Sequence, residues 1–162
     1  YDGGFFLYGN KIFINISQCL DNWFAIITHE MYHARKMKFR SKIDRVFCNM
    51  TLLSNASIIH KMSVLFAEEG IATLIEHDGK KPENVVEIRD KHSCLKKIII
   101  LTHHNKIKKM QVWEYFNEHN LRYQLGWLIA YEIYEEFGVE GLDCWSIDGD
   151  INRYFESELE WL

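Results

Sequence analysis

From residue 21 onward, apolar residues recur at three- and four-residue intervals, the spacing that places side chains on one face of an α-helix. Asp21 is the expected N-cap of the first helix. Along this helix the residues at helical spacing are Trp23, Ile26, Ile27, Met31 and Ala34. The single proline in 162 residues argues against long disordered linkers. The sequence therefore predicts a folded, mainly helical protein.

The same spacing predicts five more helices. They cover approximately residues 42–53, 58–76, 85–101, 121–137 and 150–161. Gly79 and Gly138 follow two of these helices, at positions where glycine favours the left-handed conformation that ends a helix. A polar stretch is expected between the helices that end near residue 101 and begin near residue 121.

A different pattern precedes the helices. Residues 5–8 and 11–16 flank the turn dipeptide Gly9-Asn10, and β-branched side chains alternate along the second segment. This pattern predicts a small N-terminal β-hairpin or sheet. The expected fold class is therefore α+β, mostly α, with a helical C-terminal part, in a single domain over residues 1–162.

Charge, hydropathy and cysteine spacing exclude several classes of protein. The net charge of −4 indicates no nucleic-acid partner, and no apolar run approaches the length of a membrane span. Cys19, Cys48, Cys94 and Cys144 form no CxxC pair and are expected to be buried free thiols in a reducing compartment. The chain begins at Tyr1, so excision from a longer chain and a secreted or injected protein both stay open.

The segment His29-Glu30-Met31-Tyr32-His33 falls inside the first predicted helix. Residues i and i+4 share a helix face, so the imidazoles of His29 and His33 can bind the same Zn²⁺ ion. Glu30 projects beside the water that such an ion activates, and it can take a proton from that water as a general base. The pattern HExxH therefore predicts one zinc ion per chain.

With this motif the chain resembles the HExxH zinc metallopeptidases. The metzincin branch has glycine and histidine at the positions of Lys36 and Phe39, so its extended pattern is absent. The gluzincin branch takes its third ligand from a glutamate in a Glu-Gly-x-Ala segment of a later helix, and Glu69, Gly70 and Ala72 match that segment. The resemblance implies a zincin-like domain in which Glu69 is the third zinc ligand. The small side chains at Gly70 and Ala72 are expected to let this helix approach the first one closely.

Three other residues compete with Glu69 for the third position. Glu68 is its neighbour, Glu76 lies two turns later, and His60 lies more than two turns earlier. The gap between the HExxH motif and Glu69 is longer than in compact aminopeptidase-like members. Residues 40–57 are therefore expected to form an inserted helix or loop.

A further match lies downstream. Tyr123 and Gly126 resemble the Tyr-x-x-Gly at the start of a helix in aminopeptidase-type gluzincins, where the phenol stabilises the oxyanion of the tetrahedral intermediate. The resemblance implies that Tyr123 has this role. His119, one turn earlier, could perform it with an imidazole instead.

The leading hypothesis is zinc-dependent hydrolysis of peptide bonds in a protein or peptide substrate. In related peptidases an edge strand before the active-site helix pairs with the extended substrate, and residues 11–16 are the candidate strand. Aminopeptidase members carry a glutamate there that binds the substrate's amino terminus. Residues 3–18 contain no acidic residue, so an endopeptidase is favoured.

Two alternatives stay open. One is a zinc-holding regulatory or pseudo-enzymatic binding module, against which the intact Glu30 argues because a structural site needs no base. The other is a helical interaction domain in which the motif is accidental. No nucleic-acid or membrane partner is expected, and the oligomeric state is open.

Overall fold

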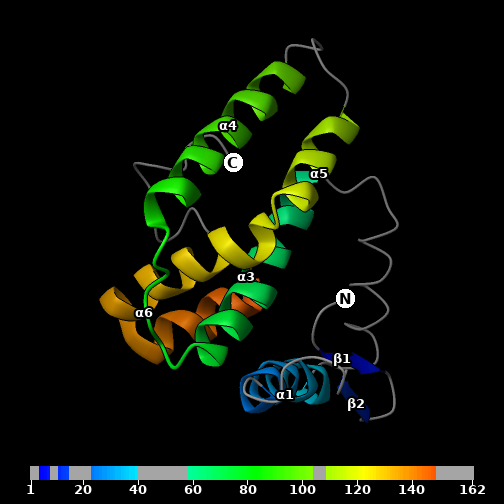
Figure 1. Cartoon of the computed structure of the whole chain (residues 1–162), viewed down its shortest axis with the longest axis vertical. Coiled ribbons are helices and arrows are strands. Elements are labelled where there is room, and N and C mark those ends of the chain that lie inside the picture. The colour runs from blue at the N-terminus through cyan, green and yellow to red at the C-terminus, as the bar shows by residue number, and fades with distance from the viewer. Residues whose placement is uncertain (1–3, 8–10, 15–22, 40–57, 104–108, 149–162) are drawn as a thin grey trace.

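Helices account for most of the described part of the chain. The computed structural model describes residues 4–7, 11–14, 23–39, 58–103 and 109–148. Along the chain the elements are β1 (Gly4–Leu7), β2 (Lys11–Ile14), α1 (Trp23–Phe39), α3 (Ile58–Glu76), α4 (Val85–His103), α5 (Lys109–Glu118) and α6 (Leu121–Asp148), as Figure 1 shows. No helix among these described residues is long and apolar enough to cross a bilayer.

The predicted α+β class is wrong. Where the structure describes side chains, 89% of the residues are helical, in five helices, and no strand is among them. The strands β1 and β2 have four residues each, pair antiparallel only with each other and lie beside α1 (Figure 1). A two-stranded ribbon of this length buries too little apolar surface to form a layer. The packed fold is therefore all-helical.

The predicted limits of α3 are confirmed, since that helix spans Ile58–Glu76. It ends in a turn where the Gly79 N–H donates to the Leu74 carbonyl over 2.9 Å. Gly79 adopts a φ of 72°, the left-handed conformation that a side chain would disfavour. The expected Asp21 N-cap and the helices predicted at 42–53 and 150–161 lie outside the described residues.

Two helical segments were missed by the sequence analysis. Gly138 interrupts α6 as expected, with φ 64° and ψ −157°, but helix resumes after it and continues to Asp148. The predicted polar stretch contains α5. This helix was missed because most of its residues are polar and only Val112 and Phe116 form its inward face. These two residues are four apart and both essentially inaccessible to water.

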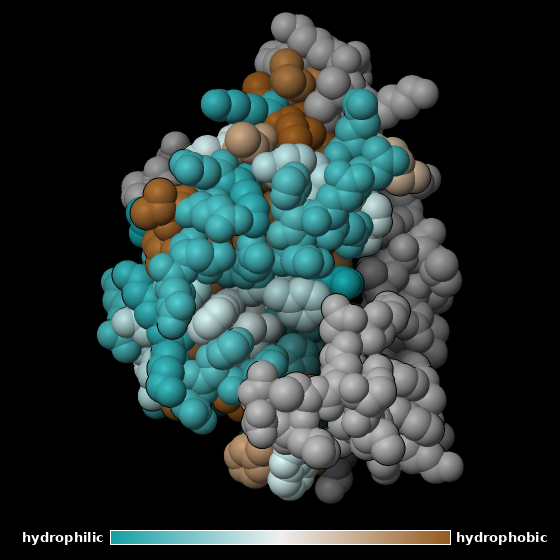
Figure 2. Space-filling model, in the orientation of Figure 1, coloured by the Kyte–Doolittle hydropathy of each residue, from teal (hydrophilic) through white to brown (hydrophobic). Residues whose placement is uncertain are grey.

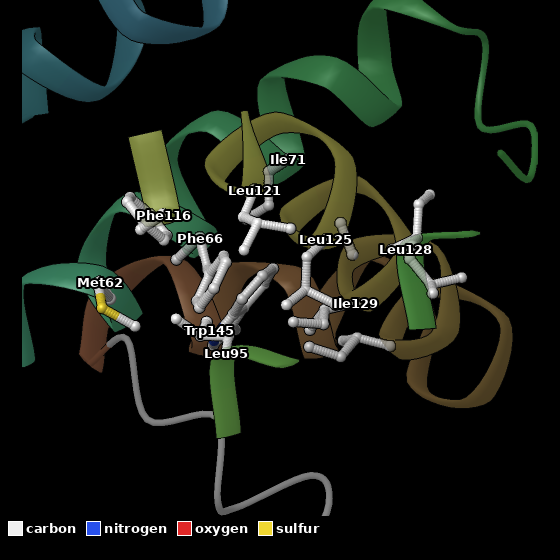
Figure 3. Packing of buried hydrophobic residues seen from close by; sticks show 14 of the residues in the cluster. Met62, Phe66, Ile71, Leu95, Phe116, Leu121, Leu125, Leu128, Ile129 and Trp145 are labelled. Atoms are coloured by element: carbon white, nitrogen blue, oxygen red, sulfur yellow. The ribbon is translucent and has the colours of Figure 1, made fainter. Parts of the chain in front are cut away.

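The hydrophobic core lies where α3, α4, α5 and α6 meet (Figure 3). The rings of Phe66 and Phe116 pack edge to face with centroids 5.3 Å apart, and Trp145 lies in the same cluster, fully buried. The face in Figure 2 is mainly hydrophilic, with smaller hydrophobic patches. The thiols of Cys94 and Cys144 are exposed, so the expectation of buried cysteines is wrong for these two.

The helices α3 and α6 cross in backbone contact at Gly70 and Gly126. A Cβ added to Gly70 would overlap the Gly126 backbone, and one added to Gly126 would lie 2.8 Å from the Phe66 carbonyl oxygen. The expectation that Gly70 lets its helix approach the HExxH helix is therefore wrong, because the partner of Gly70 is α6. Only glycine at both positions permits this separation.

Gly126→Ala should lower the free energy of unfolding by about 3 kcal/mol, because backbone atoms cannot rotate away from the new methyl group. Gly138→Ala is the matched control, since nothing lies within 4 Å of its Cβ and only its positive φ is strained. That strain costs about 1–3 kcal/mol, because φ 64° with ψ −157° is a conformation that essentially only glycine adopts. Denaturant unfolding of both variants measures the difference. A Gly126→Ala protein that is as stable as the parent would contradict the close crossing.

Candidate metal centre

The buried face of α1 is polar. His29 and Glu30 are 9% and 7% exposed, whereas Trp23 and Met31 are 53% and 56% exposed. The apolar spacing that indicated this helix therefore does not mark its buried face at Trp23 and Met31. An ordinary surface helix buries its apolar residues and exposes its ionisable ones. A helix with the opposite arrangement needs partners that compensate the buried charges, and α3 supplies them.

Three ligand atoms from α1 and α3 form a nearly equilateral triangle. The Nε2 atoms of His29 and His33 are 3.2 Å apart, and Glu69 Oε2 lies 3.4 Å from each. Zinc binds nitrogen and oxygen at roughly 2.0–2.1 Å in a tetrahedron, whose edges are then about 3.3 Å. The triangle matches one face of that tetrahedron. His29, His33 and Glu69 could therefore hold one metal ion.

Glu76 contacts the other nitrogen of His29. Its Oε2 lies 2.9 Å from Nδ1, so a neutral His29 that donates Nδ1–H to Glu76 keeps the Nε2 lone pair for a metal. Glu69 and Glu76 are seven residues apart, which is two turns of α3. Both carboxylates therefore lie on the face of α3 that packs against α1. A carboxylate in this position fixes the tautomer and orientation of a metal-binding histidine.

The sequence analysis considered Glu76 only as a rival ligand. The structure brings Glu69 to both imidazoles and leaves Glu76 behind the ring of His29. The seven-residue spacing was the signal that could have identified this second role. Glu68 turns to a different partner, with its Oε1 3.7 Å from the Lys36 ammonium. His60 lies in the first turn of α3, and its side chain is outside the described ones.

The charges at this centre are strongly coupled. Burial lowers the pKa of His29, but hydrogen bonds to Glu69 and Glu76 outweigh burial and raise that pKa to about 9. Burial raises the pKa of Glu69, but hydrogen bonds to His29 and His33 prevail and lower it to about 2. Without a metal, a proton on His29 therefore supplies positive charge between the carboxylates. A divalent cation would replace that proton.

Glu30 has the environment of a general base. It lies next to His29 on α1, and burial raises the pKa of its carboxyl group, assisted by the negative charges of Glu69 and Glu76. The positive charges of His33 and His29 oppose that rise. A carboxylate that binds a proton more readily than usual is suited to accept one from water near neutral pH.

Tyr123 lies near His29. Its ring centroid is 6.3 Å from that of the imidazole, and it projects from the first turn of α6, one turn before the glycine crossing. His119 instead packs its ring on Tyr115, with centroids 4.2 Å apart, in the turn between α5 and α6. Of the two candidate oxyanion donors, Tyr123 is the one whose ring lies near a histidine of the HExxH motif, His29.

Glu69→Gln should weaken zinc affinity roughly a hundredfold or more, because it removes a charged ligand atom. Glu76→Gln should weaken it about ten- to hundredfold through loss of its hold on His29. Glu68→Gln is the matched control and should leave affinity unchanged. Competition with a zinc chelator measures all three. An affinity loss in Glu68→Gln equal to that in Glu69→Gln would contradict the ligand assignment.

The metal-free protein should lose stability as pH rises from about 6.5 to about 9, because the pKa of His29 is raised to about 9 in the folded chain and is about 6.5 when unfolded. Protonation therefore stabilises the fold fully below pH 6.5, by up to about 3 kcal/mol. Thermal unfolding across this range measures the loss. Zinc loading should remove it and release protons at pH 7.5, as calorimetry in buffers of different ionisation enthalpy can detect. A metal-free protein that is equally stable at pH 6.5 and pH 9 would contradict the predicted role of the proton on His29.

The sequence and structure of this chain were compared with known proteins. No protein-family profile matches the chain, and neither a curated protein nor a solved structure matches it. The features of this chain that indicate a metal centre are the His29–His33–Glu69 triangle and the buried groups around it.

Proposed function

We propose that this chain is a zinc-dependent metallopeptidase that hydrolyses internal peptide bonds. The observation that carries the proposal is the fit of the His29–His33–Glu69 triangle to one face of a zinc tetrahedron, with buried Glu30 beside it. Two neutral imidazoles and one carboxylate are a donor set that catalytic zinc takes, with a fourth position left for reactants. A purely structural zinc site would use four protein ligands and would need no buried carboxylate beside them.

Zinc held here would polarise the scissile carbonyl and lower the pKa of the attacking water. The carboxylate of Glu30 accepts the proton that this water loses on attack and returns it to the leaving amine. The raised pKa of Glu30 favours the first transfer, because burial destabilises its ionised form. Glu76 takes no part in the proton transfer and holds the ring of His29 in its ligating orientation.

Tyr123 acts in the proposal as the donor to the oxyanion. Its ring lies beside His29, and its hydroxyl would donate a hydrogen bond to the oxygen that becomes negative during attack. The Gly70–Gly126 crossing fixes Tyr123 relative to Glu69, since each residue lies within one turn of it. Such preorganisation is what makes a single donor effective.

The ribbon beside α1 offers a surface for an extended substrate. The strand β2 ends at Ile14, ahead of the HExxH helix, and both strands contact α1. A peptide that pairs with an outer strand edge would run past the histidines with its backbone held by hydrogen bonds. Binding of this kind needs no free amino terminus, which agrees with cleavage inside a chain.

Glu30→Gln should abolish hydrolysis while zinc binding persists, because glutamine keeps the shape of glutamate but cannot accept the proton. Cleaved termini identified by mass spectrometry in a cell extract, with parent and variant compared, give the readout. Elemental analysis gives the zinc content. Full zinc with no Glu30-dependent cleavage in the parent would instead support a zinc-holding binding module. An absence of zinc from the parent would support the alternative of a helical interaction domain in which the HExxH motif is accidental.

Tyr123→Phe should retain fold, zinc and KM but lower kcat about a hundredfold, because the hydroxyl acts only when charge develops in the transition state. Phenylalanine keeps the ring against His29, so packing is preserved. His119→Ala is the control and should have a much smaller effect. An active Tyr123→Phe together with an inactive His119→Ala would reverse the two roles.

A further inference from the structure

Arg122 places a positive charge beside the proposed oxyanion donor. Its guanidinium carbon lies 4.9 Å from the centroid of the Tyr123 ring, and that centroid lies 6.3 Å from the ring of His29. The guanidinium is therefore at most about 11 Å from the His29 ring, the sum of those two separations. Arg122 also belongs to the first turn of α6, where the helix dipole adds further positive potential.

The guanidinium of Arg122 lacks a carboxylate partner among the described residues. Its Nε is buried without a hydrogen-bond acceptor there, and its described contact is with the face of the Tyr123 ring. Arg89 provides the contrast, because its Nη2 donates to Glu132 Oε1 over 3.1 Å. The Nε itself is out of reach of a ligand, but the remaining N–H groups of a guanidinium can still pair with an anion from a bound molecule. A planar guanidinium fits a carboxylate best.

We propose that Arg122 binds an acidic side chain of the substrate close to the scissile bond, and so makes an acidic residue the preferred one at that position. This inference rests on the proposed peptidase function. An extended peptide advances about 3.3 Å per residue. The separation from His29 therefore restricts the recognised residue to the few that flank the cleaved bond. The ligand is the carboxylate of an aspartate or glutamate side chain.

A purely positioning role for Arg122 makes a different prediction. If the guanidinium only held the Tyr123 ring through their cation–π contact, removing it would slow the cleavage of every substrate equally. Recognition of a carboxylate instead changes the ratio between acidic and neutral substrates. The ratio of kcat/KM for matched glutamate and glutamine peptides therefore separates the two roles.

The first experiment maps the preference of the zinc-loaded protein. A peptide library prepared from a digested proteome is cleaved, and the new termini are identified by mass spectrometry. One position near the cleaved bond should be enriched in aspartate and glutamate. The best sequence is then synthesised with glutamate or glutamine at that position and with an amidated C-terminus. Amidation removes the terminal carboxylate as a competing source of the recognised group.

The glutamate peptide should be cleaved with a kcat/KM roughly tenfold or more above that of the glutamine peptide, as expected for a charged hydrogen-bonded pair. Arg122→Met should bring this ratio to about one. Arg122→Glu should instead favour a third peptide, with lysine at that position, over the glutamine peptide. Arg89→Met, which removes an arginine from α4, should leave the ratio as in the parent.

A binding measurement makes the outcome independent of turnover. Fluorescence anisotropy of both labelled peptides on zinc-loaded Glu30→Gln protein should show the same preference for glutamate, and adding Arg122→Met should remove it. If the parent cleaves peptides with no acidic preference, or if Arg122→Met keeps the preference, the inference is overturned while the peptidase function stands. If nothing is cleaved, the anisotropy is measured on a fixed peptide pair that differs only in glutamate or glutamine. A preference for glutamate that Arg122→Met removes would then mean that the peptidase function fails and carboxylate recognition stands, and no preference would overturn both.

Discussion

The backbone contact between Gly70 of α3 and Gly126 of α6 sets the position of most groups at the candidate site. Glu69 immediately precedes the first glycine, and Tyr123 lies one turn before the second. One crossing therefore fixes the candidate ligand Glu69 on α3 relative to Tyr123 on α6. The helix α1 then needs only to pack on α3 to bring its histidines to Glu69. Rigid helices position such groups more accurately than loops do.

Electrostatics explain why α1 packs with a polar face inward. Three carboxylates, from Glu30, Glu69 and Glu76, meet two imidazoles with little exposure to water. Such a cluster is unfavourable unless positive charge is supplied, either as a proton on His29 or as a metal ion. In metal-free protein a proton on His29 would supply that charge. A divalent cation satisfies the same groups with greater charge, which is why folding and metal binding should be coupled.

Local sequence predicted local structure, but it did not predict which surfaces meet. The limits of α3 and the break at Gly138 follow from apolar spacing and glycine chemistry, and both are confirmed. The α+β class was wrong because the sequence pattern that predicts two paired strands does not predict whether those strands pack into the hydrophobic core. Apolar spacing did not identify the buried face of α1, because such spacing marks burial only when the partner surface is apolar, and here that surface carries Glu69 and Glu76. Motif spacing predicted that His29 and His33 lie together, and the family resemblance pointed to Glu69, whereas the contact of Glu76 with His29 required the packed structure.

The central claim is that two histidines and one glutamate bind a single zinc ion. X-ray absorption at the zinc edge, on protein loaded with one equivalent, tests it most directly. The account predicts nitrogen and oxygen neighbours only, at about 2.0–2.1 Å, with the multiple scattering of two imidazoles. Glu69→Gln should change this spectrum and Glu68→Gln should not. A sulfur neighbour near 2.3 Å, or a spectrum with fewer than two imidazoles, would contradict the assignment.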